Sequence, residues 1–153
     1  MNTNTARATN VVSATTRFLR HGTGHCDPVV DYLDKASALL KEGYRCLAGG
    51  DLEGALEAGY QAVLRTAGAR VAATSTDRKR RPITGSVWDK LRKIDAAGIA
   101  QAEQFERFAR TRSRLVMGVP VLISGGLVKE LLIAAEDFIQ WVNEETGLLP
   151  IAA

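Results

Sequence analysis

Apolar side chains recur every three or four residues through four long stretches of this 153-residue chain. The clearest stretch lies near the end and runs through Val128, Leu131, Ala135, Phe138 and Val142. This spacing puts apolar groups on one face of an α-helix, whereas a half-buried β-strand needs them at every second position. No stretch of the sequence shows that alternation. The pattern therefore predicts an all-α fold, an up-down bundle of four to five helices with a short N-terminal arm.

Helix-capping residues divide the first half of this pattern. Asp27 followed by a proline predicts the start of one helix, and the Gly49-Gly50 pair predicts its end. The short turn forces an antiparallel hairpin with a second helix, which Asp51 caps and which runs to about residue 73. Glycines inside that second helix indicate a close approach of neighbouring helices; they are Gly54, Gly59 and Gly68.

The second half is divided in the same way. Ser86, with an acidic residue three positions later, predicts a capping box at the start of the third helical stretch. We expect that stretch to kink or split at the Ala97-Gly98 pair. Ser124 predicts the start of the last helix, and a Thr-Gly pair at 146–147 predicts its end. The expected organisation is an arm over residues 1–27 and a helical bundle over residues 28–149.

The formal net charge of +3 is unevenly distributed. Residues 74–97 carry seven basic groups against three acidic ones, and residues 118–153 carry one lysine against five acids. Two interpretations stand: a solvated surface with attraction between the third and last helices, or an anion-binding patch. Arg112 falls near the apolar face of the third helix, so we expect it to pair with Glu136 or Asp137.

The basic segment is the strongest candidate for a functional site. Its cations surround a tryptophan, an arrangement that can bind RNA or DNA through phosphate contacts and base stacking. The candidate nucleic-acid-binding residues are Arg78, Lys79, Arg80, Arg81, Trp88, Lys90, Arg92 and Lys93. The alternative for Trp88 is that it packs into the end of the bundle, and the alternative for residues 78–81 is a solvated connection.

Other chemistries find little support in the sequence. His21 and His25 have glycines between them, Cys26 and Cys46 form no metal-binding motif, and no glycine-rich phosphate loop is present. We therefore expect no catalytic residues, no metal and no cofactor. The longest uncharged run is broken by glycine and proline and is too short to span a bilayer. A cytoplasmic protein without a membrane partner is the expectation.

Several of these features together resemble one protein family. They are the helical hairpin with Leu56, Tyr60, Leu64 and Ala67, the basic segment ending in Pro82, Ser86-Val87-Trp88 and the acidic stretch Ala134–Phe138. Over about residues 29–149 the chain resembles the actinobacterial branch of the HEPN superfamily (higher eukaryotes and prokaryotes nucleotide-binding domains). The resemblance implies a four- to five-helix bundle that is often dimeric. It also implies a role in toxin–antitoxin or other defence systems, as a metal-independent ribonuclease or a noncatalytic partner.

The ribonuclease motif of that family is an arginine followed, after four to six residues, by a histidine near the last helix. The last helix of this chain has neither residue type, and the one matching spacing, Arg20 to His25, lies in the arm. The expected function is thus a noncatalytic binding and assembly module, a homodimer that contacts RNA through its basic segment. Two alternatives stand: a metal-independent ribonuclease, and an immunity-like partner that binds a basic protein through the acidic last helix.

Overall fold

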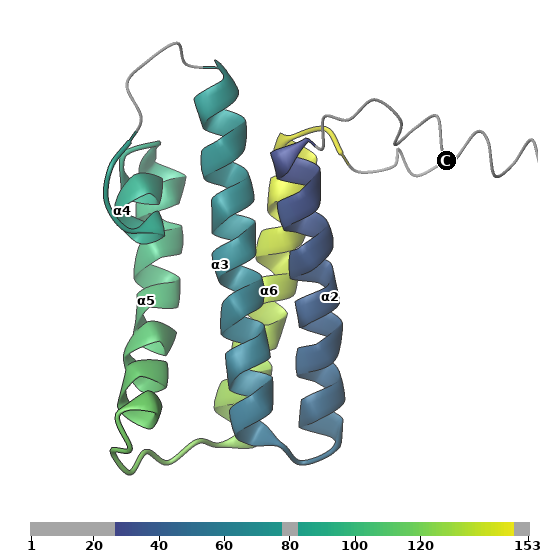
Figure 1. Ribbon diagram of the computed structural model, residues 1–153, viewed down its shortest axis with the longest axis vertical. Helices are drawn as coiled ribbons and strands as arrows, with labels where there is room; N and C mark the ends of the chain where they lie inside the picture. Colours follow the sequence, from purple (N-terminus) through teal and green to yellow (C-terminus); the bar gives the residue numbers. More distant parts are fainter. Residues whose placement is uncertain (1–26, 78–82, 149–153) are drawn as a thin grey trace, which may run out of the picture.

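The computed structural model describes residues 27–77 and 83–148, and these residues form helices and connections with no β-strand. The helices are α2 (Pro28–Ala48), α3 (Leu52–Asp77), α4 (Val87–Arg92), α5 (Ala96–Val116) and α6 (Gly125–Glu145). Successive long helices run in opposite directions along the same axis (Figure 1). The predicted all-α up-down bundle is confirmed for the described part of the chain. The arm expected over residues 1–27 lies outside it except for Asp27.

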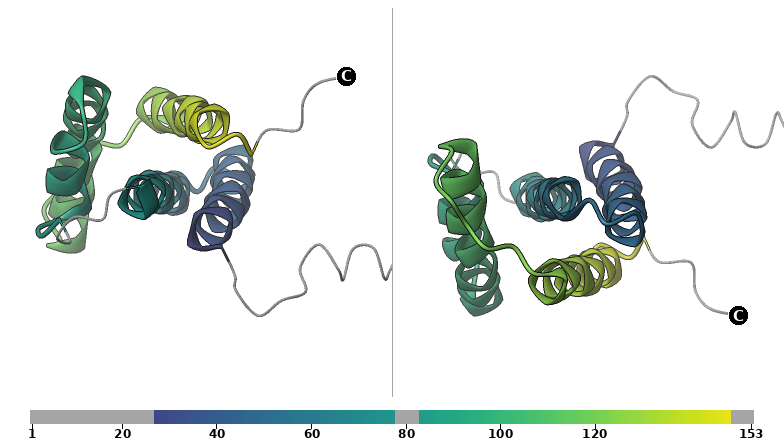
Figure 2. Two further views of the ribbon diagram at one scale, coloured as in Figure 1. Left: turned by 90° about the horizontal axis from the view of Figure 1, so that it is seen from above. Right: turned by 90° about the horizontal axis from the view of Figure 1, so that it is seen from below.

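Helix α3 is at the centre of the bundle. Viewed from either end, α3 and α6 lie between α2 on one side and the α4–α5 pair on the other (Figure 2). This position explains the composition of α3, whose fully buried positions are mostly small; they include Ala55, Ala62, Ala67 and Ala69. The sequence pattern predicted one apolar face for this helix, whereas the structure buries it on several sides.

A leucine of α6 inserts between two glycines of the α2–α3 hairpin. A Cβ atom added at Gly43 would lie 2.6 Å from Leu132 Cδ2, and one added at Gly59 would lie 2.9 Å from the same atom. The close approach predicted at Gly59 is therefore confirmed. Gly68 lies against the ring of Tyr32, and Gly54 leaves room for the side chain of Asp51. Glycine lowers helix propensity, and here tight packing of the hairpin offsets that loss.

The predicted helix starts are confirmed by their hydrogen bonds. The side chains of Asp27 and Ser124 accept the backbone N–H groups of Val29 (3.0 Å) and Leu127 (3.1 Å). Asp51 accepts from Gly54 N–H at 2.9 Å, which begins α3 at the predicted residue. These contacts satisfy donors that a helix N-terminus would otherwise leave unpaired.

Three long helices end in the same type of cap. Gly50, Gly118 and Gly147 each follow the last turn with a positive φ of 80°, 69° and 67°. In each case the glycine N–H and the next N–H bond back to carbonyl groups of the last turn, as in a Schellman motif. The loop from α5 to α6 therefore leaves its helix along a defined path.

The third helical stretch is split, but not where the sequence predicted. The break falls at residues 93–95, between α4 and α5, and Gly98 lies inside the first turn of α5. A Cβ atom at Gly98 would lie 2.0 Å from the carbonyl oxygen of Leu91. The glycine therefore lets the two helices meet at a corner rather than breaking a helix at its own position. Among the described residues, no helix is long and apolar enough to cross a membrane.

Candidate nucleic-acid interface

The candidate site residues divide between described and undescribed parts of the chain. Arg78, Lys79, Arg80 and Arg81 lie outside the described residues, as do both histidines and Cys26. The remaining candidates lie on α4 or directly after it; they are Trp88, Lys90, Arg92 and Lys93. The geometry of α4 therefore determines what the described half of this surface can do.

Helix α4 is fixed by a capping box. Ser86 Oγ accepts from Asp89 N–H at 3.2 Å, and an Asp89 carboxylate oxygen accepts from Ser86 N–H at 3.1 Å and from its hydroxyl at 2.7 Å. These bonds from Ser86 lower the pKa of Asp89 below its usual value. The carboxylate of Asp89 is thus held at the start of the helix.

Trp88 packs into the bundle and does not face solvent. Its side chain is 6% exposed, its indole N–H donates to the hydroxyl of Tyr60 at 3.3 Å, and its ring stacks on Phe105 with centroids 6.1 Å apart. A ring covered in this way has no free face for a base. The sequence left two interpretations of Trp88 open. The structure shows that Trp88 packs into the bundle, so the expectation that it stacks on a base is wrong. The apolar surface of the indole is more stable against the aromatic core than in water.

Arg92 joins α4 to α5. Its guanidinium makes two hydrogen bonds to the carboxylate of Glu106, one of them at 2.9 Å, and lies 3.9 Å from Asp89. The bonds raise the pKa of Arg92 and lower that of Glu106. An arginine that is neutralised by a paired carboxylate is a weak phosphate ligand. Arg92 therefore serves mainly to hold α4 against α5.

The two lysines differ from Arg92. Lys90 is half-buried on α4, and Lys93 is exposed, with its ammonium donating to the carbonyl of Thr84 at 3.2 Å. No carboxylate is paired with either lysine in the part of the chain that the structure describes. The described candidates therefore include two lysines, Lys90 and Lys93, without a paired carboxylate among the described residues.

A buried arginine at the other face of the same corner was not foreseen from the sequence. Arg70 of α3 has a side chain only 7% exposed, and its guanidinium bonds both carboxylate oxygens of Asp95 at 2.8 and 2.7 Å. It also donates to Gln101 Oε1 at 2.7 Å and lies 4.5 Å from the ring centre of Trp141. Its place three residues after Ala67, on the apolar face of α3, is the feature from which it could have been inferred.

The expected partner of Arg112 is wrong. Arg112 pairs with Glu57 of α3 rather than with Glu136 or Asp137, and its Nη2 lies 3.0 Å from Glu57 Oε1. The bond from Arg112 lowers the pKa of Glu57. The reason is the rotation of α5 about its own axis, which turns position 112 towards α3 and Arg107 towards α6. The expected attraction between the third and last helices is present at the pair of Arg107 with Glu130.

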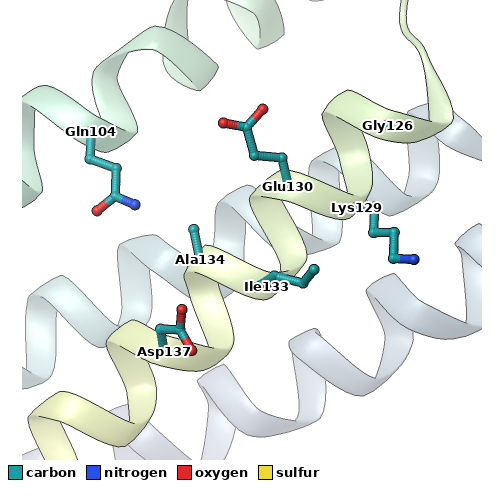
Figure 3. Close-up of a pocket in the computed structure, with 7 residues that line it drawn as sticks. All are labelled: Gln104, Gly126, Lys129, Glu130, Ile133, Ala134 and Asp137. Carbon is teal, nitrogen blue, oxygen red and sulfur yellow. The ribbon is translucent and has the colours of Figure 1, made fainter.

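A shallow hollow of about 430 Å³ lies along α6 opposite Gln104 of α5 (Figure 3). Its charged lining consists of Lys129, Glu130 and Asp137, which all belong to α6. Charges of both signs on one helix create no strong field of either sign, and the lining contains no nucleophile beside a base. No group of three metal-ligating side chains is found among residues 27–77 and 83–148.

Four long antiparallel helices with one short corner helix, α4, make up the described part of this all-α chain. Residues 53–143 match the SAV_6107-like HEPN family, and this match covers more than half of the chain. The chain therefore belongs to the SAV_6107-like HEPN family. Comparison with curated proteins and with solved structures gives no match.

Proposed function

We propose that this chain is a noncatalytic HEPN-like binding and assembly module that contacts RNA through its basic segment. The observation that carries the proposal is the position of α4. Trp88 and Leu91 anchor this helix in the core, and its capping box fixes its direction. Lys90 and Lys93 are thereby held on and directly after α4, about ten residues along the sequence from Arg78–Arg81.

Charge accounting around α4 supports a phosphate ligand. The capping box holds Asp89, and Glu106 is paired with Arg92. These two carboxylates therefore already have hydrogen-bond partners, while neither Lys90 nor Lys93 forms an ion pair with a carboxylate among the described residues. A surface of this kind binds the phosphate backbone by releasing counterions, and its affinity falls as salt rises.

The noncatalytic part of the proposal is supported by the sequence of α6. This helix, Gly125–Glu145, has neither the arginine nor the histidine of the family's ribonuclease motif. In the family's motif the histidine and the arginine can serve as base and phosphate clamp for attack by a 2′-hydroxyl, and α6 has neither of these two residues.

The test is binding of a short single-stranded RNA across a salt series. We expect Lys90→Ala with Lys93→Ala to weaken binding about threefold to thirtyfold and to make the salt dependence shallower by about two phosphate contacts. Changing residues 78–81 to alanine should have a larger effect. The matched control changes Lys41 and Lys129, two exposed lysines elsewhere on the bundle, and should leave binding nearly unchanged.

Two results would contradict the proposal. One is no RNA binding by the wild-type chain at low salt. The other is equal weakening by the control pair, which would indicate attraction by net charge alone. Cleavage of the RNA that is lost in His25→Ala would favour the ribonuclease alternative.

A further inference from the structure

The connection from α5 to α6 carries the most exposed apolar side chains of the described chain. Among the residues that the structure describes, seven large apolar side chains are exposed, and four of them lie between positions 116 and 122. Val116, Met117 and Leu122 are 74%, 77% and 94% exposed, whereas the three outside this stretch reach at most 46%. Positions 116–122 are called the apolar loop here. Apolar groups gathered in this way on a folded protein indicate an interaction surface.

The apolar loop is held at both ends. The N–H groups of Gly118 and Val119 bond back to the last turn of α5, and Ser124 caps α6. The ring of Pro120 restricts the backbone between these points. The loop lies at the end of the bundle where α5 stops and α6 starts (Figure 1). Because the loop is already ordered, its apolar side chains lose little backbone freedom when they enter an interface.

The charges along the chain on either side of this loop are mainly positive. Arg110 and Arg114 are exposed in the last two turns of α5, and neither forms an ion pair among the described residues. From position 107 to position 135 the one acidic residue is Glu130, which is paired with Arg107. The loop therefore combines exposed apolar side chains with two cations that lack a counter-charge.

The acids at this end of the bundle belong to another connection. Asp51 and Glu53 are exposed where α2 turns into α3. That turn leads to α2, which lies on the far side of α3 and α6 from α5 (Figure 2). A negatively charged surface is therefore attracted to the α5 side of this end and repelled from the α2–α3 turn, so it would meet the bundle at a tilt.

We propose that the apolar loop inserts Met117 and Leu122 into an anionic membrane surface, with Arg110 and Arg114 at the lipid phosphates. The long aliphatic part of each arginine can lie along the lipid while its guanidinium reaches the phosphate. The proposal goes beyond the proposed function and does not depend on RNA binding.

The shape and the charge of the loop favour lipid over a protein partner. A side chain that is 94% exposed, as Leu122 is, projects from the molecule, and a protein partner would have to provide a matching pocket for it. The interfacial region of a bilayer accepts projecting apolar groups without a preformed pocket, and anionic headgroups attract cations beside them. The expectation of no membrane partner rested on the absence of a spanning segment, and binding at the surface needs none.

The first test is cosedimentation with lipid vesicles in the absence of RNA. The wild-type chain should bind vesicles of phosphatidylcholine mixed with phosphatidylserine, and should bind pure phosphatidylcholine vesicles much more weakly. Met117→Ser with Leu122→Ser should weaken binding to the mixed vesicles at least about tenfold. The matched control, Ile99→Ser with Ile133→Ser, changes two exposed apolar residues outside the loop and should bind like wild type. Circular dichroism checks that each variant is folded.

The second test changes the cations. Arg110→Gln with Arg114→Gln should weaken binding to the mixed vesicles about tenfold to thirtyfold, since each cation near an anionic surface contributes about fivefold. Arg65→Gln with Lys41→Gln lowers the net charge by the same amount at exposed positions elsewhere and should have little effect. Equal weakening by the two pairs would mean attraction by net charge alone and would overturn the proposal.

Other results would also overturn it. The first is a wild-type chain that does not bind the mixed vesicles at low salt, and the second is binding that the loop substitutions leave unchanged. Vesicle binding that is lost in Lys90→Ala with Lys93→Ala, but kept in the loop variant, would place the lipid contact at the basic segment. A chain that ignores vesicles, but whose loop variant loses self-association in solution, would assign the loop to a protein contact.

Discussion

Arg70 and Asp95 meet in a two-bonded ion pair, with both Asp95 oxygens within 2.8 Å of the arginine Nη2. The same carboxylate accepts from Gly98 N–H at 2.7 Å and so caps α5. One side chain therefore begins α5 and neutralises the buried cation of α3. The pair fixes the corner at which α4 ends and α5 begins, two residues after Lys93.

Removing Asp95 is expected to be more costly than removing an ordinary cap. Asp95→Ala leaves the Arg70 guanidinium buried without its counter-charge and removes the N-terminal cap of α5. We expect a loss of about 3–5 kcal/mol in the free energy of unfolding, measured by urea denaturation. Asp34→Ala, an exposed change on α2, should stay within about 0.5 kcal/mol of wild type. A loss below about 1 kcal/mol at Asp95 would show that the pair contributes little.

Gly98→Ala should destabilise the protein although alanine is the better helix former. The added Cβ would lie 2.0 Å from the Leu91 carbonyl oxygen, so α4 and α5 must move apart. The expected cost is about 1–3 kcal/mol in thermal or urea unfolding. At Gly126 the nearest atom outside the helix backbone is Ser124 Oγ at 3.8 Å. Gly126→Ala should therefore be neutral or stabilise by up to about 1 kcal/mol. Equal effects at the two glycines would contradict the close contact at the corner.

Two tyrosine hydroxyls should differ in their contribution to stability. Tyr60→Phe removes the acceptor of the buried Trp88 indole N–H, and an unpaired buried donor costs about 1–3 kcal/mol. Tyr44→Phe removes a hydroxyl that donates to exposed Glu136 at 3.0 Å, where water can replace it, and should cost less than about 0.5 kcal/mol. Urea unfolding followed by tryptophan fluorescence measures both. A smaller loss in the free energy of unfolding for Tyr60→Phe than for Tyr44→Phe would contradict this prediction.

The pair of Glu57 with Arg112 predicts a dependence of stability on acid pH. Hydrogen bonding by Arg112 lowers the pKa of Glu57 in the folded chain below the ordinary value of 4.5. The contribution of the pair is therefore full above about pH 4.5 and is lost as the pH falls through the lowered pKa. Both side chains are partly exposed, so we expect Glu57→Gln to cost only about 0.5–1 kcal/mol at neutral pH.

The pH series gives this prediction its control. The stability difference between wild type and Glu57→Gln should shrink towards zero on acidification. Glu103→Gln, at an exposed α5 carboxylate with no ion pair among the described residues, should show a difference near zero throughout. A Glu57→Gln difference that stays constant down to pH 3 would mean that the carboxylate charge is not what stabilises the pair.

The helices could be predicted because their ends depend on local chemistry. Asp27, Ser86 and Ser124 bond to N–H groups two or three residues away, so sequence spacing alone identifies them. The rotation of a helix about its own axis decides which neighbouring helix each of its faces contacts. The pattern of charges along the sequence does not determine this rotation. This is why the sequence predicted an ion-pair partner for Arg112 on α6, whereas the actual partner, Glu57, lies on α3.

The site was less predictable because its contacts join distant segments. Arg70 and Asp95 are 25 residues apart and meet only when α5 turns back along α3. The sequence allowed Trp88 either to stack on a base or to pack into the end of the bundle, and its packing depends on contacts with Tyr60 and Phe105. The basic composition of residues 78–93 was visible, but which cations remain unpaired depends on the position of Glu106.

The central position of α3 has a consequence for how this family can vary. Helix α6 keeps one side in water, so its tolerance to large side chains should rise and fall with the helical turn. Helix α3 has neighbours on several sides, and its small residues are what allow them to approach. A saturation mutagenesis scan should therefore find a nearly continuous band of intolerance from Ala55 to Ala69, interrupted at exposed Arg65. Divergence among relatives would then accumulate on the outer helices, while α3 changes slowly.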